Sequence, residues 1–309
     1  MTHELDGQVF AHLAKMPDAH RSLVEPLVTG EAQDEWLREA LMAYLRHFVR
    51  VLDRGEPREP AERQLIDSLG AIVGLVGTGD AEADLDAAEA ELAKGFVARG
   101  YRFLGGRTPP HLGPYAWART DTQRFTVALP LGEPQEVAVH FLHDFVIRGW
   151  LYWESFGTRG AGGWYQDGDP SWPDGLYCVA DRYPDPLQNP SFQVSLLGHE
   201  AQHVADHRAF SGLSSNELEY RAKLVELIGH QAVDDRLAFF LDDARDDPEY
   251  PHPHAAHLII QRLSQRMFGS PADVTDWRGL DYDDIRAQAL ALLEEDTARL
   301  AQPRPPGSE

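Results

Sequence analysis

The sequence predicts a mostly helical α+β protein, and three observations support this fold class. Apolar residues recur at the three- and four-residue steps of amphipathic helices in the first hundred residues and again from Ser191 onward. Between these regions, residues 105–183 are rich in glycine, proline and aromatic residues, and short extended runs there predict a small sheet. The chain has 309 residues and is 43% apolar and 25% charged, which provides enough apolar material for a sizeable core.

The N-terminal helices are predicted over residues 33–54, 60–76 and 81–99. The third begins with an acidic first turn, which suits the N-terminus of a helix. We therefore assign residues 1–104 to a helical N-terminal region, which ends at the Pro- and Gly-rich stretch 105–114.

The second region, residues 105–302, is predicted to hold the sheet and the remaining helices. Extended segments are expected at residues 123–129, 136–142 and 176–181. Helices are expected at about residues 192–210, 215–243, 254–268 and 281–301. The Pro-rich C-terminus, residues 303–309, is predicted to be a disordered tail.

Charge and cysteine content exclude several classes of function. The formal net charge of −22 argues against a nucleic-acid partner, because such binding requires clustered Lys and Arg. The single cysteine, Cys178, rules out an intrachain disulfide and a thiolate-rich zinc site. No run approaches about 18 consecutive apolar residues, and the N-terminus lacks the pattern of a signal peptide. We therefore expect a cytoplasmic protein without a membrane partner.

One segment, His199-Glu200-Ala201-Gln202-His203, has the spacing of a metal site. Residues four apart on an α-helix stand one above the other, so both imidazoles can bind one ion. Glu200 sits about 100° around the helix, where its carboxylate can flank the ion and act as general base toward a zinc-activated water. The alternative is a pair of histidines that are satisfied by ordinary hydrogen bonds.

A third ligand is expected from the helix that follows the turn at residues 211–216. Glu219 lies on the flank of the apolar stripe of that helix, whereas Glu217 points nearly opposite and fits a capping box with Ser214. Glu219 is therefore our choice of ligand, although it could instead cap the helix or pair with Lys223. The buried stripe is expected at Leu218, Ala222, Val225 and Gly229.

This pattern of two helices and a turn resembles the zincin metallopeptidases, in particular their glutamate-ligand (gluzincin) branch, over residues 192–230. The resemblance implies that His199, His203 and Glu219 bind zinc and that Glu200 is the catalytic base.

Two details of the resemblance bear on the ligand choice. Asn216-Glu217 is also similar to the thermolysin-like pattern, and that alignment would make Glu217 the ligand. Lys223 stands where some of these peptidases carry an acidic residue, and Ala209 stands where the metzincin branch carries a third histidine.

The sequence therefore predicts a zinc-dependent hydrolase, with Zn²⁺ as cofactor, that cleaves peptide bonds in a peptide or protein substrate. The resemblance implies that an edge strand binds the substrate backbone by strand addition, and residues 176–181 are our choice for it. The alternative is a non-catalytic zinc-containing binding or regulatory protein, with partners docking on an acidic helical surface.

Several residues near the motif are assigned supporting roles. Asp206 and His207 are candidates to hydrogen bond to the metal-bound imidazoles. Stabilisation of the oxyanion is expected from one residue among Tyr220, Tyr250, His252, His254 and His257.

Overall fold

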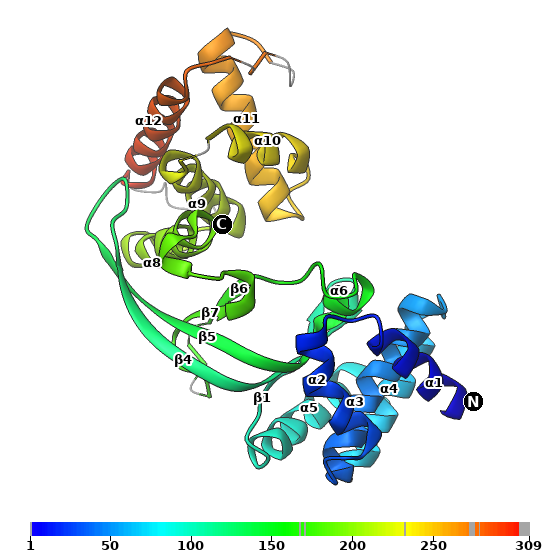
Figure 1. Cartoon of the computed structure of the whole chain (residues 1–309). Coiled ribbons are helices and arrows are strands. Elements are labelled where there is room, and N and C mark those ends of the chain that lie inside the picture. Colours follow the sequence, from blue (N-terminus) through cyan, green and yellow to red (C-terminus); the bar gives the residue numbers. More distant parts are fainter. Residues whose placement is uncertain are drawn as a thin grey trace. The chain divides into compact units, whose positions relative to one another are not determined.

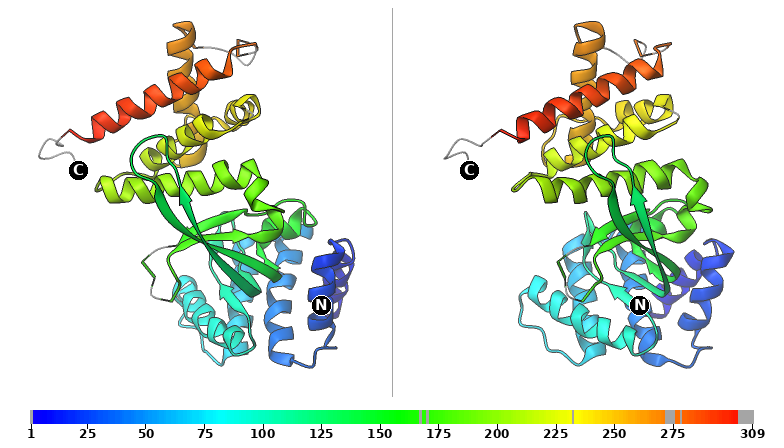
Figure 2. Two further views of the ribbon diagram at one scale, coloured as in Figure 1. Left: turned by 60° about the vertical axis from the view of Figure 1, so that its left-hand side comes forward. Right: turned by 90° about the vertical axis from the view of Figure 1, so that its left-hand side faces the viewer.

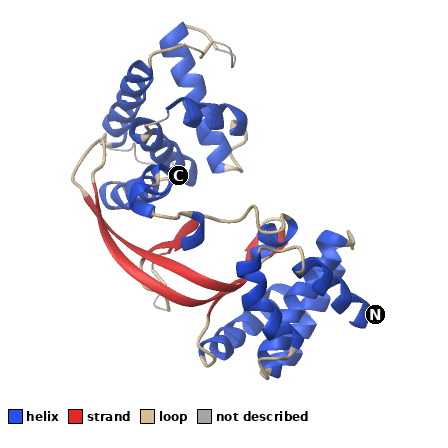
Figure 3. Cartoon of the chain, in the orientation of Figure 1, coloured by secondary structure: helices blue, strands red, loops and turns tan. Residues whose placement is uncertain are grey.

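The computed structural model describes residues 2–166, 168–169, 171–231, 233–271, 276–277 and 279–302. The described residues are 58% helical and carry a small sheet of five strands, which confirms the mostly helical α+β fold class. Figures 1 and 3 show the helices and the sheet. The tail predicted at residues 303–309 lies outside the described residues.

Contacts divide the chain into two compact units. The first comprises Met1–Asp121 with Phe141–Ala161, and the second comprises Thr122–His140 with Gly162–Glu309. The division predicted from the sequence, into residues 1–104 and residues 105–302, remains a prediction.

In the first unit, helices pack around α3 (Glu35–Phe48). The others are α1 (Thr2–Leu13), α2 (Asp18–Thr29), α4 (Arg58–Val73), α5 (Ala81–Val97) and α6 (Gly149–Glu154), and a π-helical segment η1 (Val49–Asp53) continues α3. Helix α3 begins at Asp34, whose carboxylate accepts a hydrogen bond from the Leu37 amide at 2.9 Å. Leu41, Tyr44 and Phe48 are almost wholly buried, so α3 forms the centre of this core.

The sheet has the strand order β1-β4-β5-β7-β6. Its strands are β1 (Arg102–Leu104), β4 (Tyr115–Val127), β5 (Gln135–Arg148), β6 (Gly163–Gln166) and β7 (Gly175–Val179), and a separate antiparallel pair is formed by β2 (Arg107–Thr108) and β3 (His111–Leu112). Strands β1 and β4 are antiparallel, as are β6 and β7, where Trp164 lies opposite Tyr177. Strands β4 and β5 contribute residues to both units.

The edge strand differs from the one chosen on the sequence. Strand β7, within the predicted segment 176–181, lies between β5 and β6, and all five of its residues are buried. The choice of 176–181 as an edge is therefore wrong, and β6 is the outer strand on that side of the sheet, with β1 at the other end. A short apolar run has the same pattern at an edge and in the middle of a sheet, so the sequence did not distinguish them.

In the second unit, helices surround α9 (Ser215–Gly229), as Figures 1 and 2 show. Its partners are α8 (His199–Ala209), α10 (Val233–Asp243), α11 (Pro251–Phe268) and α12 (Tyr282–Leu300), and α8 is preceded by α7 (Pro190–Phe192) and a π-helical segment η4 (Gln193–Gly198). Eight consecutive residues of α9, from Tyr220 to Leu227, are buried. Of the predicted stripe, Ala222 and Val225 are buried, whereas Leu218 is half-buried and Gly229 is exposed, so the prediction is wrong at both ends of the helix. In the middle the stripe is too narrow, because neighbours cover this helix on several sides.

The predicted helix 215–243 is two helices, α9 and α10. Helix α9 ends at Gly229, a residue of low helix propensity, and His230 takes extended backbone angles (φ −72°, ψ 132°). This break lets α10 pack back against α9. No helix in the described part of the chain combines the length and the apolar character needed to span a bilayer.

Candidate metal centre

Helix α8 carries both histidines of the motif and packs closely against α9. The segment before α8 also lies close to α9: a Cβ on Gly229 would lie 3.2 Å from Val194 Cγ1 in η4, so a glycine at the end of α9 suits this approach. The π-helical segment η4 ends at Gly198, directly before His199. The local sequence thus sets the helix register just before the first histidine.

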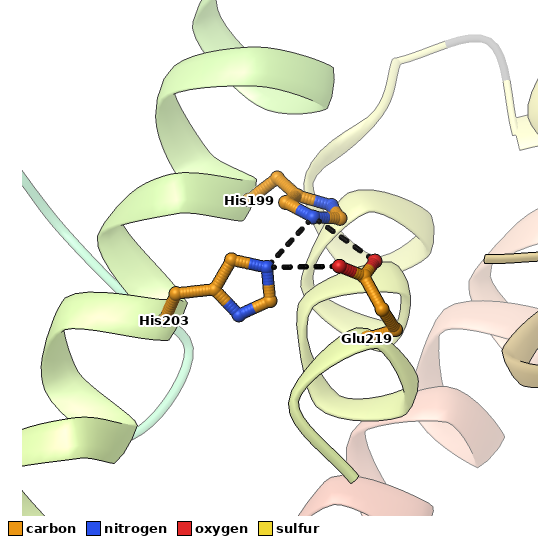
Figure 4. Close-up of side chains that lie close together, drawn as sticks. All are labelled: His199, His203 and Glu219. Atoms are coloured by element: carbon orange, nitrogen blue, oxygen red, sulfur yellow. Dashed lines mark hydrogen bonds and ion pairs between the residues drawn. The ribbon is translucent and has the colours of Figure 1, made fainter. Parts of the chain in front are cut away.

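Helix α9 begins with the predicted capping box. The Ser214 hydroxyl accepts from the Glu217 amide at 3.3 Å, and the Glu217 carboxylate accepts from the Ser214 amide at 3.0 Å. Glu217 also pairs with Arg299 at 3.1 Å. The Glu217 carboxylate is therefore engaged at the start of the helix, and Glu219, two residues on, faces α8 (Figure 4).

His199, His203 and Glu219 come together, as Figure 4 shows. The two imidazole Nε2 atoms are 3.0 Å apart, Glu219 Oε2 lies 3.3 Å from His199 Nε2, and Glu219 Oε1 lies 3.4 Å from His203 Nε2. Atoms bound tetrahedrally to zinc at about 2.0–2.1 Å are separated by about 3.3 Å. The three residues therefore have the spacing of ligands around one ion.

The charges in this cluster favour a cation. Burial alone would lower the pKa of His199, but hydrogen bonds with Glu219 and Glu226 outweigh it and raise that pKa to about 10. Burial works to raise the pKa of Glu219, yet its contacts with His199, His203 and His252 hold it well below the usual range. A negatively charged carboxylate and nitrogen lone pairs that converge in this way are stabilised by a proton or by a metal ion.

Glu200 is close to the cluster but is not one of the three converging residues. Burial raises the pKa of its carboxyl group, and the charges of His199 and His203 partly oppose that shift. A carboxylate with a raised pKa beside a metal site is suited to accept and return a proton.

Glu226 is a site residue that the sequence analysis did not assign. His199 Nδ1 donates to Glu226 Oε1 at 2.7 Å, and this hydrogen bond leaves the Nε2 lone pair of a neutral ring directed at the cluster. Burial works to raise the pKa of Glu226, but His199, Arg236 and Lys223 together lower it. Glu219 and Glu226 are seven residues apart and so share one face of α9, a spacing from which this role could have been recognised.

The two residues expected to support the imidazoles lie elsewhere. Asp206 accepts from Gln202 at 2.8 Å and from Arg221 at 2.9 Å, and Arg221 also donates to Asp296 at 3.1 Å. His207 is exposed. Asp206 therefore belongs to a buried ionic network that joins α8, α9 and α12, and it does not hold a histidine of the cluster.

Among the candidates for oxyanion stabilisation, His252 of α11 is the one with a contact to the cluster in the described part of the chain. Its Nδ1 lies 2.7 Å from Glu219 Oε2, its ring stacks on His199 with centroids 5.8 Å apart, and its side chain is 62% exposed. His254 and His257 instead lie 3.7 Å and 3.9 Å from Asp246.

The two tyrosine candidates are placed differently. Tyr220 is buried with the Arg262 guanidinium 4.7 Å from its ring centroid, whereas Tyr250 is exposed. The structure thus singles out His252 from the five residues by its contact with the cluster.

The chain was compared with known proteins, and no protein-family model, no curated protein and no solved structure matches it.

Proposed function

We propose that this protein is a zinc-dependent hydrolase of zincin type, and that it cleaves peptide bonds. The observation that carries the proposal is the convergence of His199 Nε2, His203 Nε2 and the Glu219 carboxylate at separations of 3.0–3.4 Å. Imidazole nitrogens and a carboxylate are typical zinc ligands, and a set of three leaves one position of a tetrahedral ion for water or substrate.

Bound zinc would supply Lewis acidity, polarising a carbonyl and lowering the pKa of a water to about 7. Glu200 then takes a proton from the attacking water onto a carboxylate oxygen. Because burial raises its pKa, Glu200 can hold that proton and pass it to the leaving amine. His252, exposed at the rim of the cluster, has its Nδ1 engaged by Glu219, so the role assigned to it is to donate Nε2–H to the developing oxyanion when both ring nitrogens carry a proton.

The outer strand β6 supports a peptide as the substrate. It ends the strand order of the sheet in the described residues, and a Cβ on its first residue, Gly163, would lie 3.4 Å from the Leu196 side chain in η4. An extended peptide added to an outer strand gains main-chain hydrogen bonds. Strand β6 replaces residues 176–181 as the strand assigned to this role.

Metal content tests the first part of the proposal. The purified protein should bind about one zinc ion per chain, as a three-ligand site requires. The measurement is elemental analysis after dialysis against buffer that contains a weak chelator. Negligible zinc uptake would overturn the proposal.

The role of Glu200 tests the second part. Glu200→Gln should retain zinc and reduce kcat on a peptide library by about 10²–10⁴-fold, the usual contribution of a general base. Glu249→Gln, which neutralises an exposed carboxylate in the same half of the chain, is the matched control. Bound zinc without turnover of any peptide by the wild type would favour the non-catalytic zinc-containing binding or regulatory protein instead.

A further inference from the structure

Arg236 of α10 is the second partner of the buried carboxylate that holds His199. One of its guanidinium nitrogens, Nη2, pairs with Glu226 Oε2, while Glu226 Oε1 accepts from His199 Nδ1 at 2.7 Å. The Glu226 side chain is 2% exposed and that of Arg236 is 17% exposed. The contacts therefore form a continuous line from α10, through α9, to a ligand on α8.

The position of Arg236 is itself well defined. Its guanidinium lies 4.6 Å and 5.2 Å from the ring centroids of Phe239 and Phe240 on its own helix. Stacking on aromatic rings restricts a guanidinium, so less freedom is lost when it binds a carboxylate. Lys223, another cation near Glu226, lies 4.8 Å from the centroid of Phe240.

A buried carboxylate that has lost its cation is costly and rearranges to recover solvent or a proton. If Glu226 moved, the hydrogen bond to His199 Nδ1 would weaken, and the ring of His199 could rotate or place its proton on Nε2. Either change removes the nitrogen lone pair that faces Glu219 and His203.

We propose that Arg236 is a positioning residue for the metal centre: by holding Glu226 it orients His199, so that the metal affinity of the site depends on the packing of α10. This inference rests on the proposed function, because it concerns the same three ligands. It assigns α10 a part in metal binding although none of the three converging residues lies on that helix.

The test is the zinc affinity of Arg236→Gln, measured by competition with a chromophoric chelator. Loss of a residue that orients a ligand typically weakens metal binding about 10- to 100-fold, and we expect a loss in that range. Arg236→Lys keeps the charge without the planar fork and should recover part of the affinity. Arg208→Gln removes the same charge from the surface of α8, where Arg208 donates to Gln135, and should leave the affinity unchanged.

A double-mutant cycle separates positioning from a general loss of packing. In a Glu226→Gln background, Arg236 has no carboxylate to hold, so adding Arg236→Gln should change the zinc affinity by no more than about twofold. If both effects simply add, Arg236 acts by another route and the inference is overturned. If the wild type binds zinc and Arg236→Gln binds it equally well, the inference also fails. If the wild type binds no zinc, the proposed function fails instead.

Discussion

Two buried histidines, His199 in the second unit and His47 in the first, differ in the charges around them. Both residues are nearly inaccessible, at 5% and 1% exposure. Burial lowers the pKa of His47 to about 4, whereas carboxylates raise that of His199 to about 10 despite the same burial. Burial alone therefore favours the neutral form of a histidine, whereas convergent carboxylates favour the charged form of one that is equally hidden.

The two histidines differ in how an arginine binds the carboxylate beside each of them. Glu62, the carboxylate that influences His47, is bound by Arg107 through two hydrogen bonds of 2.7 Å and 2.8 Å. Glu226 is also bound by an arginine, but only through Oε2, so Oε1 remains for His199. The two hydrogen bonds from Arg107 occupy both oxygens of Glu62. The single contact from Arg236 leaves Oε1 of Glu226 free to accept from His199 and so to orient its ring.

The largest expected effect is on zinc binding. His199→Gln and Glu219→Ala each remove one of three ligands, so both should abolish stoichiometric zinc uptake, a greater loss than the 10- to 100-fold typical of orienting residues. His47→Leu should bind zinc like the wild type. Elemental analysis of the three variants makes the comparison, and equal zinc uptake by all of them would contradict it.

His47 should make the free energy of unfolding depend on pH, because burial lowers its pKa in the folded chain. Its pKa is about 4 in the folded chain and about 6.5 in the unfolded chain, so the unfolded chain binds more protons between these values. Its contribution is complete above about pH 6.5 and is lost as pH falls toward about 4, by up to about 3 kcal/mol.

Urea unfolding of the wild type and of His47→Leu, at several pH values between these limits, measures the contribution. The wild type should lose stability relative to the variant as pH falls. Parallel pH profiles would show that His47 is not held neutral by burial.

Metal removal should affect the helices of the site selectively. At a free zinc concentration of about one hundred times Kd, a ligand that binds only the folded state adds about 2.7 kcal/mol of stability. Hydrogen exchange with and without a chelator should therefore show that zinc protects the amides of α8 and α9, while those of α3, which carries His47, change less. Equal protection of α3 and α8 would contradict a local site.

The smallest effect is expected at Glu217. Glu217→Ala removes one side of the capping box of α9 and should cost about 1 kcal/mol of stability without changing zinc binding. Thermal unfolding and zinc titration measure both quantities. If zinc were lost in this variant and kept in Glu219→Ala, the alternative alignment with Glu217 as ligand would be correct.

Much of the fold followed from local sequence patterns. The helices at 33–54 and 81–99, the extended segments at 123–129 and 136–142, and the capping box at Ser214 all depend on residues close together in the chain, and the structure has elements at each of these places. The placement of His199 and His203 on one helix face also follows from a four-residue spacing.

Contacts between distant segments decided the rest. The outer position of β6 and the partners of Asp206 depend on which elements pack together.

The sequence by itself determined that two histidines and a nearby carboxylate are presented by successive helices, because helical spacing is a local property. Only the tertiary structure decided that Glu226 holds His199, that Arg236 holds Glu226, and that His252 reaches Glu219. The physical reason is that one helix sets the direction of its own side chains, whereas the partner a side chain meets is set by the packing of several helices at once.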